Sequence, residues 1–169
     1  MISDIIRTFL SLLSSWYPNN NISKKKDDYL RNQILKKIDK IKINNKNLQK
    51  THINFNKKIL KLLKNKGLKN FLRKNFIQKM FFLQNRFFIY QELSDLKKSK
   101  KWKFYKNLLN EDSIGNPIRF FLYLKSSGNR INHVYHLNIF ENELKINIQK
   151  KIKTVFEFGG GYGCMARIF

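Results

Sequence analysis

A cluster of glycines near the end of the chain constrains its fold more than any other feature. Residues 154–158 form a β-branched and aromatic run, typical of a strand, that contains the acidic Glu157. Glycines follow, and a helical pattern begins after Gly163. A strand, a tight glycine turn and a helix start let a backbone approach a nucleotide-like cofactor closely. The sequence therefore predicts that an α/β unit opens over residues 151–169.

The region before this motif has the periodicity of a helical protein. Apolar residues at helical spacing predict a mostly α region over residues 1–150, without internal repeats. The expected helices are an amphipathic one over the first sixteen residues, then about 24–42, 48–66, 68–93, 102–109 and 130–148. We expect residues 68–93 to form one buried helix, because this apolar stretch contains neither glycine nor proline.

Two short segments interrupt this helical pattern. Ser113–Pro117 contains a Gly-Asn-Pro sequence, and Ser126–Asn129 contains a Ser-Gly-Asn sequence, so both predict turns. The apolar run 118–124 between them is compatible with a strand or a helix. The predicted organisation is a helical N-terminal region leading into the first strand and helix of a truncated Rossmann-like domain.

The composition limits the classes of partner. The net charge of +24 suits a nucleic-acid-binding protein, but Lys and Arg are spread from Lys24 to Arg167, and no zinc-finger or ribonucleoprotein motif accompanies them. We therefore expect no nucleic-acid partner. The apolar start is too short to span a bilayer, so no transmembrane segment is expected. One cysteine permits no internal disulfide and favours a reducing, cytoplasmic location.

The glycine turn fits two cofactor registers. Gly161, Gly163 and Ala166 match the dinucleotide pattern Gly-x-Gly-x-x-Ala. The earlier register, acidic-x-Gly-x-Gly-x-Gly, starts at Glu157 and accounts for the acid and for a third glycine at Gly159. It favours S-adenosylmethionine. A fragment of an NAD(P)-dependent oxidoreductase stays open as an alternative, as does a basic helical nucleic-acid-binding protein with incidental glycines.

Residues 157–163, Glu-Phe-Gly-Gly-Gly-Tyr-Gly, resemble the first cofactor motif of class I S-adenosylmethionine-dependent methyltransferases. The helical region before them is similar to that of a family of sugar O-methyltransferases, which also has a Gly-Asn-Pro segment upstream. The resemblance implies methyl transfer to a hydroxyl of a sugar or glycan precursor. It also implies these cofactor-binding residues: Glu157, Gly159, Gly160, Gly161, Gly163 and, as a lining residue, Tyr162.

The motif comes late in the chain, since only residues 164–169 follow Gly163. The rest of the sheet, a ribose-binding acid and a catalytic base are not found in this sequence. We expect the chain alone to have no methyltransferase activity and only feeble cofactor affinity, and the sequence identifies no catalytic residue.

Other chemically active residues carry weaker signals. His133 and His136 lie three apart and share a helix face, but no acid or cysteine stands beside them at a metal-ligand spacing. We expect ordinary packing or surface histidines and no metal site. Tyr135 is expected in a core or interface, and Cys164 as a small packing residue.

Overall fold

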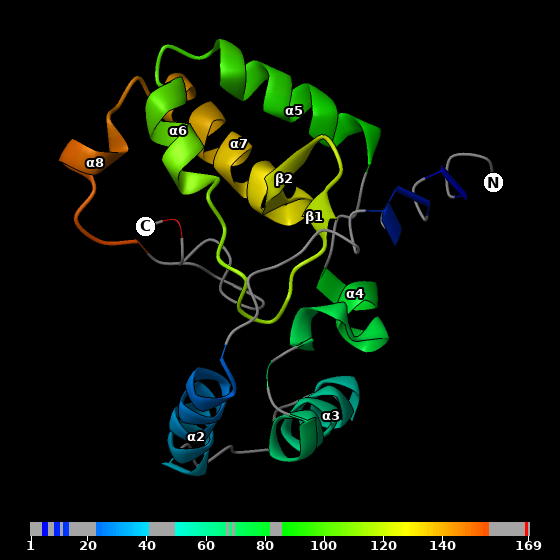
Figure 1. Cartoon of the computed structure of the whole chain (residues 1–169). Coiled ribbons are helices and arrows are strands. Elements are labelled where there is room, and N and C mark those ends of the chain that lie inside the picture. The colour runs from blue at the N-terminus through cyan, green and yellow to red at the C-terminus, as the bar shows by residue number, and fades with distance from the viewer. Residues whose placement is uncertain are drawn as a thin grey trace. The chain divides into compact units, whose positions relative to one another are not determined.

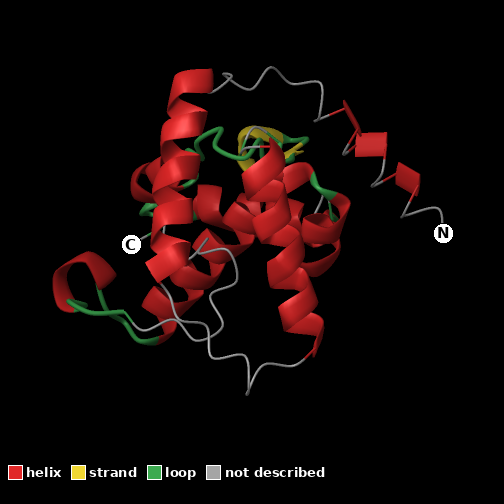
Figure 2. Ribbon diagram, turned by 90° about the horizontal axis from the view of Figure 1, so that it is seen from below, coloured by secondary structure: helices red, strands yellow, loops and turns green. Residues whose placement is uncertain are grey.

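The computed structural model describes most of the chain, in segments. The described residues are 5, 6, 9, 10, 12, 13, 23–40, 50–66, 68, 70–81, 86–155 and 168. Over these residues the protein has seven α-helices and one small antiparallel sheet, so the predicted mostly helical character is confirmed (Figures 1 and 2). The predicted strand and glycine turn lie almost wholly outside them. Thr154 and Val155, which begin the predicted strand, adopt no strand conformation.

The chain forms two compact units, and neither is one continuous segment. The smaller unit comprises Pro18–Asn75 and Ser113–Pro117, and the larger comprises Met1–Tyr17, Phe76–Asp112 and Ile118–Phe169. The predicted boundary near residue 150 stays a prediction, because residues 156–167 lie outside the described part of the chain.

The smaller unit contains two basic helices at the predicted positions. They are α2 (Lys24–Lys40) and α3 (Lys50–Lys66). The Asp27 carboxylate, in the first turn of α2, accepts hydrogen bonds from the backbone N–H of Leu68 at 3.0 and 3.2 Å. This contact joins the start of α2 to the chain just beyond α3.

The prediction of one buried helix over 68–93 is wrong. This stretch forms a 3₁₀ turn at Phe71–Arg73, helix α4 (Asn75–Phe81) and the start of α5 (Phe87–Lys98). Lys74 is extended, with ψ of 132°, and the Leu72 N–H donates to the Gly115 carbonyl at 2.8 Å. A tertiary partner thus takes a backbone group that a continuous helix would use. Three of the aromatic residues expected to be buried are exposed: Phe87, Phe88 and Tyr90.

The predicted turn at Ser113–Pro117 is confirmed, and it requires its glycine. Gly115 has φ of +76°, a conformation that L side chains rarely adopt. A Cβ atom there would lie 2.8 Å from Cγ of Leu72. The turn also binds the neighbouring segment through Asn116, whose carbonyl accepts from Arg73 Nε at 3.0 Å.

The larger unit has its core between helices. Helix α5 packs against α7 (Gly128–Glu143) and α6 (Trp102–Leu108), and α8 (Ile148–Lys151) adds one side chain. Figure 1 shows α5 lying beside α7. The buried residues are Ile89, Leu93, Leu96, Tyr105, Leu109, Phe120, Ile131, Val134, Leu137, Ile148 and Ile168.

A short hairpin precedes α7. The run 118–124, which fitted strand or helix, lies mainly in β1 (Arg119–Phe120) and β2 (Tyr123–Ser127), an antiparallel pair. The expected break at Ser126–Asn129 contains the junction between β2 and α7, but it forms no separate turn. Ser127 both ends β2 and caps α7, because its Oγ accepts from the Arg130 N–H at 3.3 Å. Helix α7 therefore begins at Gly128.

Replacing Gly115 with alanine is expected to destabilise the protein by about 2 kcal/mol, through the strained φ and the overlap with Leu72. Urea unfolding of the single variants and of Gly115→Ala/Leu72→Ala measures this. Because the double variant removes the overlap, its cost is expected to be smaller than the sum of the two single costs. Strictly additive costs would contradict this explanation.

Lys145 offers the opposite substitution. It follows α7 with φ of +49° and is exposed. We expect Lys145→Gly to stabilise the protein by about 1 kcal/mol, because glycine adopts this conformation without cost. Lys145→Ala is the control: it removes the same charge but retains the strain. Equal stabilisation by both variants in thermal unfolding would point to charge instead.

Candidate functional site

The cofactor-binding residues predicted from the sequence lie outside the described part of the chain. These are Glu157, Gly159, Gly160, Gly161, Tyr162 and Gly163. The described chain reaches Val155, two residues before Glu157. The surroundings of Val155 are therefore the nearest part of the candidate site along the chain.

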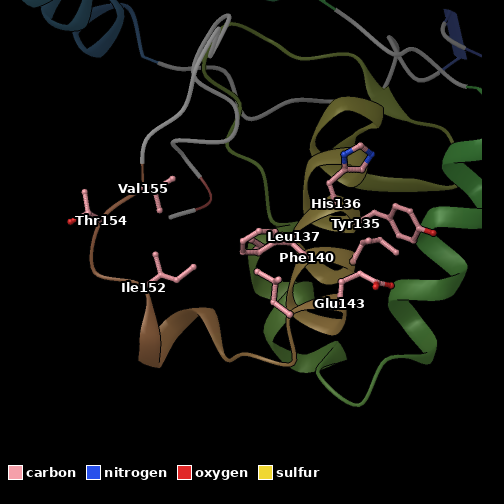
Figure 3. Close-up of a pocket in the computed structure, with 10 residues that line it drawn as sticks. Tyr135, His136, Leu137, Phe140, Glu143, Ile152, Thr154 and Val155 are labelled. Atoms are coloured by element: carbon pink, nitrogen blue, oxygen red, sulfur yellow. The ribbon is translucent and has the colours of Figure 1, made fainter.

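A groove of about 740 Å³ lies between the second half of α7 and the segment that follows α8. Figure 3 shows Ile152 pointing toward α7, where Leu137 and Phe140 lie. The described residues that line the groove are Tyr135, His136, Leu137, Ile139, Phe140, Glu143, Leu144, Ile152, Thr154 and Val155. A concave site of this size is in the range of small-molecule pockets.

The groove is mainly apolar and open to solvent. Four of its large apolar side chains are between 41% and 52% exposed: Ile139, Phe140, Leu144 and Val155. Large apolar groups gathered in one concave place indicate a surface that binds something. The histidine and the carboxylate that line it are His136 and Glu143, and both are exposed.

A chain of polar side chains runs from α5 to the edge of this groove. Asn132 Nδ2 donates to Oε1 of the buried Glu92 at 2.8 Å and lies 3.4 Å from Nε2 of His136. An amide that donates one hydrogen to an ionised Glu92 can donate the other to His136, and Nε2 must then be unprotonated. In this arrangement the His136 ring carries its hydrogen on Nδ1.

Burial of the Glu92 carboxylate lowers the stability of the fold. Burial raises the pKa of Glu92, and the hydrogen bond from Asn132 opposes this rise only in part. Its second oxygen, Oε2, is buried without a hydrogen-bond partner. A carboxylate in this setting destabilises the fold when ionised.

His133 differs from His136, although the sequence treats the two alike. His133 Nδ1 lies 2.8 Å from the carbonyl of Asn129, one turn earlier in α7, so it donates a proton to the helix backbone. His136 instead lines the groove. Within the described segments no three His, Cys, Asp or Glu residues come together as a metal site. Tyr135 is half-buried and lies edge-on to His136, with 6.2 Å between ring centroids.

Glu141 fixes the two walls of the groove. Its Oε2 accepts from Tyr105 Oη at 2.6 Å, and its Oε1 accepts from Lys101 Nζ and from the backbone N–H of Ile148, both at 2.9 Å. Burial alone would raise the pKa of Glu141, but these three hydrogen bonds outweigh it and lower that pKa. Burial and the Glu141 carboxylate raise the pKa of Tyr105. One carboxylate thus joins α6, α7 and the start of α8.

A second buried carboxylate holds the other end of α7. Glu111 Oε2 accepts from the Ser127 N–H at 2.6 Å and lies 3.5 Å from Nη1 of Arg119. Sequence reasoning missed the roles of Glu92, Glu111 and Glu141. A signal existed, because acidic residues are scarce in this chain, at 11 against 35 basic ones.

Neither a membrane-spanning helix in the described residues nor a similar known protein was found. No helix in the described segments has the length and hydropathy needed to cross a bilayer. A scan against protein-family models and searches of curated proteins and solved structures found no match.

We expect Glu141→Gln to destabilise the protein by about 2–4 kcal/mol at pH 7, because an amide cannot accept from all three donors as a carboxylate does. The lowered pKa of Glu141 means that its stabilisation is present above the ordinary carboxyl pKa. That stabilisation is lost as the pH falls through the folded-state pKa. Urea unfolding at pH 7 and at pH 3 is expected to show a smaller difference from the unmodified protein at the lower pH.

Glu143→Gln is the matched control, since Glu143 is an exposed carboxylate on the same helix. Its substitution is expected to change stability by less than about 0.5 kcal/mol. A loss from Glu141→Gln that is equally large at both pH values would contradict the electrostatic explanation.

Proposed function

We propose that this chain carries the first part of the S-adenosylmethionine site of an O-methyltransferase that acts on a sugar hydroxyl. The observation that carries the proposal is the register of Glu157 with Gly159, Gly161 and Gly163, at the end of a run of β-branched and aromatic residues. The resemblance of residues 157–163 to the first motif of class I methyltransferases points to the same cofactor.

The residue types fit this cofactor. A carboxylate at Glu157 suits the cationic amino group of S-adenosylmethionine, and glycines allow close approach of the backbone. Backbone N–H groups at the start of the following helix favour an electron-rich group. The dinucleotide register leaves Glu157 without a role, which is why we prefer the methyl donor.

The groove supplies a second element that methyl transfer needs. S-adenosylmethionine supplies an electrophilic methyl group, and the protein must align the acceptor with it and exclude water. Val155 lines the groove and is separated from Glu157 by one residue. An acceptor in the groove would therefore lie beside the segment that leads into the glycine turn.

Photolabelling of the 169-residue chain with S-adenosylmethionine radiolabelled in the methyl group tests the cofactor assignment. We expect weak labelling that S-adenosylhomocysteine competes away. Glu157→Gln is expected to reduce labelling about tenfold, equivalent to about 1.4 kcal/mol of binding free energy. Asp95→Asn, which removes an acidic charge outside both the glycine turn and the groove, is expected to leave labelling unchanged.

The competing functions predict different results in the same assay. Competition by NAD⁺ but not by S-adenosylhomocysteine would overturn the proposal in favour of the dinucleotide register. Absence of specific labelling, together with DNA or RNA binding that weakens steeply with salt, would favour the basic nucleic-acid-binding alternative.

A further inference from the structure

The groove on α7 has a composition that a bare sugar does not match. A sugar presents hydroxyl groups over most of its surface, and burying a hydroxyl without a hydrogen bond is strongly unfavourable. The walls of the groove offer it mainly Ile139, Phe140, Leu144 and Ile152. An acceptor that fills this groove must therefore carry an apolar portion.

Hydrogen bonds hold the polar end of the groove in place. His136 is held by Asn132, which is itself held by Glu92 from a different helix. This arrangement leaves Glu92 Oε2 buried without a partner, which lowers stability. A costly polar chain that ends at a groove is typical of a binding site. With Nε2 accepting from Asn132, His136 has its Nδ1–H free to donate to an oxygen of a ligand.

We propose that the groove binds an amphiphilic glycoside, with its apolar aglycone along α7 and Ile152 and a sugar hydroxyl on His136 (Figure 3). This inference rests on the proposed function and specifies its substrate class: a sugar linked to an apolar group. His136 is a positioning residue in this arrangement, because it orients the sugar and takes no part in the methyl transfer.

The volume and the position of the polar groups favour a small molecule over a protein partner. About 740 Å³ lies within the range of ligand sites, roughly 300–1,000 Å³. The sugar portion of the bound ligand would lie near His136, at the end of the groove that is closest to the start of α7. Its aglycone would extend toward Leu144, at the other end of that helix.

Calorimetric titration of the 169-residue chain with n-octyl β-D-glucoside, below the concentration at which it forms micelles, tests the proposal. We expect saturable binding, with methyl β-D-glucoside at least tenfold weaker because it lacks the apolar chain. Phe140→Asn, at an exposed position that tolerates a polar side chain, is expected to weaken octyl glucoside binding at least fivefold.

The two histidines provide the internal control. His136→Leu is expected to weaken octyl glucoside binding about fivefold, and His136→Gln to restore part of it, because glutamine keeps an N–H donor. His133→Gln is expected to have no effect, since His133 donates to the helix backbone. Equal effects at both positions, or equal affinity for the octyl and methyl glucosides, would overturn the proposal.

Sedimentation equilibrium distinguishes a groove that binds a glycoside from a groove that binds a second copy of the protein. A dimer that Phe140→Asn dissociates, with no glucoside binding, would show that the groove binds a second copy and would overturn the proposal. Failure of the proposed function is recognised independently, because photolabelling reports on the glycine turn. Glucoside binding without cofactor labelling would retain the groove as a glycoside site and remove the methyltransferase assignment.

Discussion

The buried carboxylate of Glu141 is the interaction on which the larger unit depends most. It accepts hydrogen bonds from side chains of the α5–α6 turn and of α6, and from the backbone at the start of α8. Without it, α8 would have one apolar residue, Ile148, to hold it against the core. The segment that follows α8 forms one wall of the groove, so the geometry of the candidate site depends on a single ionised group.

The distribution of acidic residues gives this basic chain its internal order. Three of the four glutamates in the described segments are buried, and each accepts a hydrogen bond from a donor on another segment. The donors that a buried carboxylate accepts from offset part of the cost of burying its charge, and the carboxylate links the elements that supply them. The lysines of the described segments lie mostly at the surface, which is how a chain with a net charge of +24 can still form an apolar core.

Sequence periodicity predicted what depends on local pattern. The helices α2, α3 and α6 begin and end within two residues of their predicted limits, because an apolar stripe at helical spacing is a local property. The prediction of a continuous helix over 68–93 was wrong because the Leu72 N–H donates to the Gly115 carbonyl, 43 residues away. The spacing of apolar residues carries no information about such a distant contact. For the same reason His136 was identified as a residue of interest, but its link through Asn132 to Glu92 was not.

Ser113–Pro117 belongs to the smaller unit, whereas the segments on either side of it belong to the larger unit. The smaller unit therefore cannot be produced as an uninterrupted fragment. A fragment ending at Asn75 would lack the carbonyl that accepts from Leu72, and the acceptor for Arg73 Nε on Asn116. During synthesis the smaller unit is complete only after residue 117 has been made, and by then residues 76–112 of the larger unit have already been made.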